Sequence, residues 1–129
     1  MTFPHTPSFR FGRLAPTLPV RDMAVALAFY EGALGFRRVF ENGEPLGFVI
    51  LRRDEAELHL SLQRNHRPVP FNVMHMIVGD VDAMHETCRR SGMRIVKGLR
   101  VHEYGLRAFV FADPDGNRID VAAPISDRT

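Results

Sequence analysis

Asp113-Pro114-Asp115-Gly116-Asn117 separates two strand-like runs, 107–112 and 118–122, near the end of the chain. Proline presets the backbone for a turn, and glycine and asparagine accept the left-handed conformations that tight turns require. The segment therefore predicts a tight turn between two adjacent strands. Together with Leu18-Pro19-Val20-Arg21-Asp22 in the first part of the chain, it carries most of the information about the fold.

The pattern that leads up to this turn occurs twice. Each half opens with a strand-like run that ends at Val-x-Asp, and the aspartate can cap the helix that follows. A glycine then stands where the end of a helix favours left-handed backbone, and three strand-like runs follow it. The matched positions are Val20 with Val78, Asp22 with Asp80, Gly35 with Gly92, and His59 with Asp120. This spacing indicates an internal duplication of one strand–helix–three-strand unit.

The duplication predicts an α+β fold of two βαβββ modules, because one such unit is too small to cover both faces of its own sheet. We expect the two helices, 23–34 and 81–91, on the outside of a curved, cup-like sheet. The predicted strands are 14–20, 36–41, 46–52 and 56–62 in the first module and 71–78, 94–97, 107–112 and 118–122 in the second.

Length and composition agree with one globular domain. The 129 residues are 45% hydrophobic and 25% charged, which is too apolar for a disordered chain. Two domains with full cores would need a longer chain. The expected parts are an N-terminal arm (1–12), a single domain (13–125) made of module one (13–63), a linker (64–70) and module two (71–125), and a tail (126–129).

The same counts exclude several classes of protein. Cys88 is the only cysteine, which rules out an internal disulfide and a cysteine-based zinc site. No apolar run approaches the roughly 20 residues of a membrane helix, so no membrane partner is expected. The first residues lack the apolar core of a signal peptide, and we therefore expect a cytoplasmic protein. Acidic residues are interspersed with the basic ones at a formal net charge of +2, which argues against nucleic acid as a partner.

Four stretches resemble the vicinal-oxygen-chelate superfamily, whose members include glyoxalase I, extradiol dioxygenases, fosfomycin-resistance enzymes and bleomycin-resistance proteins. The resemblance implies two βαβββ modules that curl into a cup, paired across a homodimer. An isologous contact would also cover the free sheet edges, and the Pro-rich arm and linker could reach across it. The stretches are Leu18–Asp22, Ala28-Phe29-Tyr30, Leu34-Gly35-Phe36 and Phe111–Asn117.

The positions that hold metal in this superfamily can be compared one by one. Metal-using members carry His or Gln five residues before the Val of Val-x-Asp, where this chain has Ala15 and Val73. The equivalent places on the closing strands hold His59 and Asp120. Because a catalytic ion usually takes three protein ligands, the resemblance implies no metal cofactor at the usual place. A displaced set of His59, His75 and Asp120 is the alternative and would allow a divalent metal.

The second half is similar to the end of bleomycin-resistance proteins, where an aromatic-Gly pair such as Tyr104-Gly105 precedes a strand. That branch implies metal-free sequestration of an aromatic, antibiotic-like ligand in a cleft at the dimer interface. Aromatic faces would stack on the ligand and carboxylates would meet its charge. Phe109, Phe111 and Arg107 share one face of their strand, and the sequence does not say whether that face lines the cup. The ligand-contact candidates are Tyr104, Phe109, Phe111, Arg107, Glu57 and Asp120.

Strand alternation places the centre of the site. Apolar neighbours flank both His59 and Asp120, so these two side chains should point away from the helices and into the cup. Glu57 shares the face of His59, and Thr17 and His75 should join from the opening strands. The alternative function is a lyase, isomerase or dioxygenase of the same superfamily that uses the displaced metal set or His59 as a metal-free general base. We favour ligand binding and leave catalysis open.

Overall fold

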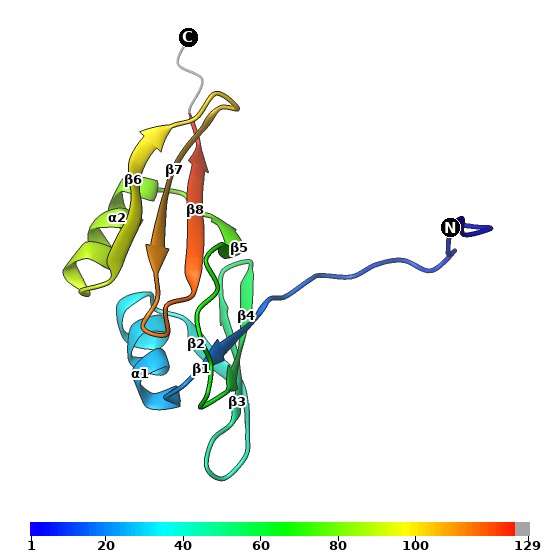
Figure 1. Ribbon diagram of the computed structural model, residues 1–129, viewed down its shortest axis with the longest axis horizontal. Helices are drawn as coiled ribbons and strands as arrows, with labels where there is room; N and C mark the ends of the chain where they lie inside the picture. Colours follow the sequence, from blue (N-terminus) through cyan, green and yellow to red (C-terminus); the bar gives the residue numbers. More distant parts are fainter. Residues whose placement is uncertain (126–129) are drawn as a thin grey trace.

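Two four-stranded sheets of the same topology form the body of the protein in the computed structural model, which describes residues 1–125 (Figure 1). The tail predicted at 126–129 lies outside the described residues. The first sheet and its helices comprise β1 (Thr17–Val20), α1 (Met23–Leu27), η1 (Ala28–Ala33), β2 (Arg37–Asn42), β3 (Phe48–Arg53) and β4 (Ala56–Leu62). The second comprises β5 (Asn72–Ile77), α2 (Val81–Arg90), β6 (Arg94–Val101), β7 (Leu106–Ala112) and β8 (Arg118–Pro124).

The strand order is the same in both modules. It runs β1-β4-β3-β2 in module one and β5-β8-β7-β6 in module two. In each sheet the opening strand pairs in parallel with the closing strand, and the other pairs are antiparallel. This arrangement confirms the predicted α+β fold of two βαβββ modules. The sheets of residues 1–125 form no closed barrel.

The helices begin where the sequence predicted. The side chain of Asp22 accepts a hydrogen bond from the backbone N–H of Val25, and that of Asp80 accepts one from Ala83. The first helix widens into the π-helical turn η1, in which the N–H of Leu34 donates to the carbonyl of Phe29. This wider turn carries Phe29 and its neighbour Tyr30, which are both buried in the core.

One face of each sheet is covered and the other is free of helices. Both helices lie on the left of the sheets in Figure 1, and the N-terminal segment extends to the right. Alternate residues of the central strands point to the helices, which is why Leu58, Leu60, Ile119 and Val121 are buried. The helix-free faces are consequently the sheet surfaces that no helix covers within residues 1–125.

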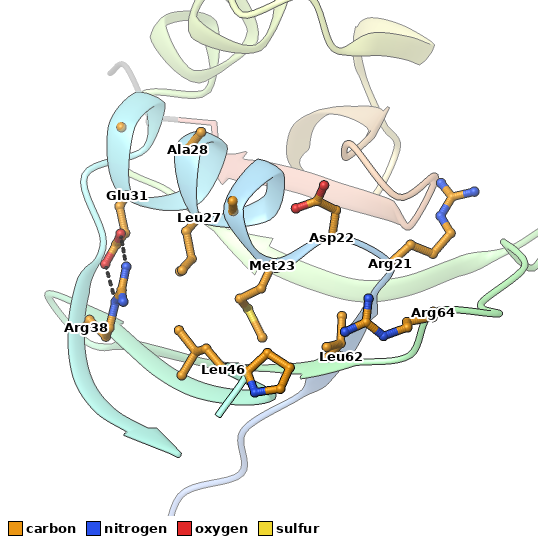
Figure 2. Close-up of a pocket in the computed structure, with 13 residues that line it drawn as sticks. Arg21, Asp22, Met23, Leu27, Ala28, Glu31, Arg38, Leu46, Leu62 and Arg64 are labelled. Atoms are coloured by element: carbon orange, nitrogen blue, oxygen red, sulfur yellow. Dashed lines mark hydrogen bonds and ion pairs between the residues drawn. The ribbon is translucent and has the colours of Figure 1, made fainter. Parts of the chain in front are cut away.

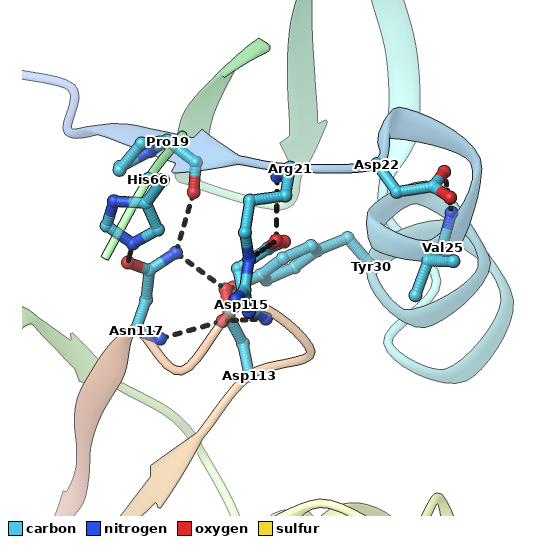
Figure 3. A network of polar contacts seen from close by, with 9 residues as sticks. All are labelled: Pro19, Arg21, Asp22, Val25, Tyr30, His66, Asp113, Asp115 and Asn117. Atoms are coloured by element: carbon cyan, nitrogen blue, oxygen red, sulfur yellow. Dashed lines mark hydrogen bonds and ion pairs between the residues drawn. The ribbon is translucent and has the colours of Figure 1, made fainter. Parts of the chain in front are cut away.

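The turn at Asp113–Asn117 fastens module two to module one (Figure 3). Its Asp113 carboxylate accepts a 2.7 Å hydrogen bond from the Tyr30 hydroxyl and two more from backbone N–H groups of the turn itself. Asp115 accepts from the backbone and side chain of Arg21, and Asn117 donates to the carbonyl of Pro19. Burial raises the pKa of Asp113. The motif that predicted the fold is therefore the joint between the modules.

Three segments differ from the expectation. The strand predicted at 94–97 continues to Val101. The strands predicted at 36–41 and 46–52 are separated by a longer loop, closed by a hydrogen bond from the N–H of Gly47 to the carbonyl of Asn42. The first strand begins at Thr17 rather than at residue 14, and the preceding residues extend away from the body (Figure 1). The arm exposes large apolar side chains at Phe3, Phe9 and Phe11, and Leu14, just after it, is exposed as well. Among the described residues, no helix has the length and apolar character to cross a membrane.

Candidate functional site

The residues that line each helix-free surface follow from strand register, because residues directly paired across neighbouring strands point to the same face. We call the surface of the first sheet face one and that of the second face two. Face one comprises Thr17, Pro19, Arg37, Phe40, Asn42, Phe48, Ile50, Arg52, Glu57, His59 and Ser61. Face two comprises Asn72, His75, Ile77, Arg94, Lys97, Arg100, Leu106, Ala108, Val110, Ala112, Arg118, Asp120, Ala122 and Pro124.

A histidine held by a carboxylate occupies the centre of face one. His59 Nε2 lies 2.9 Å from Glu57 Oε2, and the other carboxylate oxygen accepts from Arg13 at 2.8 Å. The hydrogen bond with His59, followed by the charge of Arg13, holds the pKa of Glu57 below its usual range. The ring of Phe48 stands edge-on to His59 at 5.4 Å, and Phe40 lies 6.3 Å beyond Phe48. Face one thus offers an oriented imidazole beside an aromatic row.

Face two carries its own carboxylate-held imidazole, built from two neighbouring strands and not from one. His75 Nδ1 lies 2.7 Å from Asp120 Oδ2, with the imidazole half-exposed and the carboxylate less so. The carboxylate comes from the closing strand β8 and the imidazole from the opening strand β5. Because one nitrogen of the imidazole ring bonds the carboxylate, the other nitrogen is available to form a hydrogen bond with a ligand.

The register corrects the sequence alignment of the metal positions. Thr17 pairs with His59, and His75 pairs with Asp120, so these four positions correspond between the modules. Ala15 precedes β1 altogether. In β5 a bulge between Asn72 and Met74 shifts the register by one residue, and in the pairing that follows it His75 stands directly opposite Asp120.

The structure does not gather all the predicted site residues. His59 lies with Glu57, and His75 with Asp120, but Phe109 and Phe111 are fully buried on the helix side of β7. Phe109 packs edge-on against His85 of α2 at 5.0 Å, and Phe111 packs against Phe29 at 5.7 Å. These two phenylalanines belong to the core because β7 turns its small residues, not its aromatic ones, to the open face.

Arg107 and Tyr104 also lie outside the two faces. Arg107 points to the helix side and donates to Asp82 of α2 at 2.8 Å. Tyr104 is exposed in the turn between β6 and β7, where its ring stacks on His102 at 5.1 Å. We therefore leave both residues out of the candidate site.

The displaced metal set is not assembled within one chain. His59 belongs to the first sheet, whereas His75 and Asp120 belong to the second. Across residues 1–125, no three His, Cys, Asp or Glu side chains stand close enough together to hold a metal ion. The described residues of a single chain thus provide no three-ligand set for a divalent ion.

Three basic residues of face two were missed by the sequence reasoning. Arg94, Lys97 and Arg100 are spaced by three, which is unlike the alternation of a regular strand. Two irregularities in the pairing of β6 with β7, between Ile95 and Lys97 and between Lys97 and Arg100, bring all three to one face. Only the backbone pairing reveals this arrangement, because the spacing of the three residues carries no signal for a shared strand face.

A separate groove of about 860 Å³ lies on the helix side of module one (Figure 2). Met23 and Leu27 of the helix and Leu46 and Leu62 from the sheet side line its apolar part. At one end the Arg38 guanidinium donates to the Glu31 carboxylate at 2.8 Å, so the charges there are already paired. None of the predicted site residues lies in this groove.

Two duplicated βαβββ modules, each with a helix-free sheet face, define a recognised class of α+β proteins. The chain belongs to the glyoxalase/bleomycin resistance protein/dioxygenase superfamily, whose family model matches residues 10–121. No curated protein matches the chain.

Similar solved structures agree with this family assignment. A superfamily member from Sphaerobacter thermophilus is 28% identical, with a TM-score of 0.71 over 84% of this chain and 94% of that one. A bleomycin-binding protein solved with bleomycin is 25% identical, with a TM-score of 0.71 over 88% of this chain and 98% of that one. A bleomycin resistance determinant encoded on the transposon Tn5 is 24% identical and shares the fold, with a TM-score of 0.74 over 88% and 98% of the two chains.

Proposed function

We propose that this protein binds a small organic molecule between face one of one subunit and face two of a second, without metal chemistry. The observation that carries the proposal is the pair of helix-free faces, each with a carboxylate-held imidazole near its centre. A largely apolar surface with a few convergent polar groups is typical of ligand sites. The bleomycin-binding relative supports small-molecule binding as the function.

The placement of the two faces on separate sheets supports a ligand site shared by two subunits. The two faces of one chain belong to separate sheets, so neither closes over the other's polar pair within residues 1–125. An isologous two-fold contact would set face one of each subunit against face two of its partner and make two equivalent clefts. The aromatic arm, with Phe9 and Phe11 exposed, is long enough to take part in such a contact. The proposed assembly is therefore a homodimer.

The polar pairs would fix the orientation of the ligand. Glu57 holds His59 by Nε2, and Asp120 holds His75 by Nδ1, so each ring presents its remaining nitrogen as a hydrogen-bonding group. Phe40 and Phe48 offer an aromatic surface beside His59 on which a flat ligand can stack.

The test is a thermal-shift screen of small organic molecules followed by nuclear magnetic resonance mapping of each hit. We expect hits to shift the backbone amide signals of His59 and Asp120 together. Hits that shift only Met23 and Leu27 would place binding in the helix-side groove and contradict the proposal. A screen with no hit on either face would contradict it as well.

A metal-dependent lyase, isomerase or dioxygenase is the second candidate. The observation in its favour is the register that sets His75 directly against Asp120, at the positions equivalent to Thr17 and His59. A two-fold contact of the proposed kind would add His59 of the other subunit and complete a set of two histidines and one carboxylate. Near-stoichiometric iron, manganese, nickel or zinc in the purified protein would favour this candidate. A metal content far below one ion per subunit would favour metal-free binding.

A further inference from the structure

Face two is strongly basic along one side. Arg94, Lys97 and Arg100 of β6 stand opposite Ala112, Val110 and Ala108 of β7, so all three project from the helix-free surface. Arg118 of β8 pairs with Ala112 on the same face. The four side chains form a basic rim around the small residues of β7.

The described part of the chain does not neutralise these charges. None of the four basic residues forms an ion pair with a carboxylate in residues 1–125, in contrast to Arg107 on the other side of the sheet, which pairs with Asp82. Asp120 is the single acid of face two and is engaged by His75. Face one carries two basic residues, Arg37 and Arg52, and a single acidic residue, Glu57. Both surfaces of the proposed cleft therefore carry more positive than negative side chains.

The dimensions of face two suit a small aromatic molecule. The basic row on β6 and His75 on β5 are separated by three strand spacings, or about 14 Å. On this face the strands between them carry mainly small side chains, at Ala108, Ala112 and Ala122, which are themselves almost fully buried. A ligand can span the face above them, with one end at the basic row and the other at the His75–Asp120 pair.

We propose that the ligand is an anion, an aromatic molecule carrying a carboxylate, sulfonate or phosphonate group that Arg94, Lys97 and Arg100 hold on face two. The inference rests on the proposed function and adds the chemical class of the ligand. Guanidinium groups bind such oxyanions through paired hydrogen bonds, and the ammonium of Lys97 adds a point charge. The same charges repel a cationic ligand, so this protein is expected to discriminate against bleomycin-like cations.

The test compares two dyes of opposite charge by fluorescence titration: the anion anilinonaphthalenesulfonate and the cation thioflavin T. The full-length protein should bind the anion, and the double variant Lys97→Gln/Arg100→Gln should weaken that binding roughly tenfold or more. The matched control is Arg89→Gln/Arg90→Gln, which removes the same charge from exposed positions of α2 in the same module. The control should stay within about twofold of the parent, and binding should weaken as salt is added.

Equal affinities of the two double variants for the anion would overturn the inference. Tighter binding of thioflavin T than of the anion by the parent would do the same. If that cation binding is lost in His59→Ala or Asp120→Asn, the proposed function stands and only the charge of the ligand is wrong. If neither dye binds the parent and no other small molecule does, both proposals fail. The unfolding midpoint of each variant is measured as a control, to establish that the variant is folded.

Discussion

His75 and Asp120 stand opposite each other on parallel strands β5 and β8, with the imidazole Nδ1 2.7 Å from the carboxylate Oδ2. In module one the same two register positions hold Thr17 and His59. The two sheets thus have equivalent register positions, but the side chains at these positions differ in chemistry. A molecule lying between face one and face two would meet a different set of donors and acceptors on each side. The cleft would therefore favour one orientation of the molecule.

Tyr30→Phe is expected to destabilise the protein by about 1–3 kcal/mol, because it removes the hydroxyl that donates to the buried carboxylate of Asp113. Urea unfolding measures the loss. The matched control is Tyr104→Phe, which removes an exposed hydroxyl and should change stability by less than about 0.5 kcal/mol. Equal stabilities of the two variants would show that the hydrogen bond between the modules contributes nothing.

Gly116→Ala should cost about 1–3 kcal/mol for a different reason. The backbone φ of Gly116 is +80°, and an added Cβ would lie 2.7 Å from Cγ of Pro68 in the linker. Gly98→Ala is the control, since a Cβ there meets nothing within 4 Å. Chemical denaturation of the two variants compares them directly. A loss at Gly98 as large as that at Gly116 would contradict the packing of the linker on the turn.

Stability is expected to fall at alkaline pH. Burial raises the pKa of the Cys88 thiol to about 12, and burial followed by the charge of Asp113 raises the pKa of Tyr30. Between the ordinary pKa of such a thiol, near 9, and the raised value, the unfolded chain holds fewer protons than the folded one. The contribution of the protonated thiol to the free energy of unfolding is therefore complete below about pH 8 and is lost as the pH rises toward 12. Unfolding midpoints near pH 8 and near pH 10.5 measure it, and Cys88→Ala should show a shallower decline. Parallel pH profiles of parent and variant would contradict the assignment to Cys88.

The arm is expected to strengthen the proposed dimer. Replacing Phe9 and Phe11 by serine removes two exposed rings that pack edge-on at 5.4 Å. Sedimentation of the parent at micromolar concentration should give twice the 14.6 kDa of one chain, and the variant should dissociate more readily on dilution. A parent that sediments as a single chain would contradict the dimer. A variant that dissociates like the parent would remove the arm from the contact.

The sequence was sufficient for the fold because the fold depends on local signals that repeat. Asp22 and Asp80 cap their helices as predicted, and the turn at Asp113–Asn117 joins two adjacent strands. The alternation around His59 and Asp120 likewise predicted the open side of each closing strand.

The rest of the candidate site depended on backbone irregularities. Bulges in β5 and β6 decide that His75 stands opposite Asp120 and that Lys97 and Arg100 share its face. A bulge changes register by one residue without a clear mark in a single sequence. The side of β7 was undetermined for a simpler reason. Both of its faces are apolar, so the pattern could not tell whether Phe109 lines the cup or the core.

The most direct test of the central claim, a ligand site shared by two subunits, is complementation between His59→Ala and Asp120→Asn. Each variant alone should fold like the parent and bind weakly whichever of the two dyes, anilinonaphthalenesulfonate or thioflavin T, binds the parent. When the two variants are co-expressed, half of the dimers are mixed, and each mixed dimer regains one intact cleft. We therefore expect about a quarter of the parental sites to return with parental affinity. Co-expressed variants that bind no better than either variant alone would contradict a cleft between subunits.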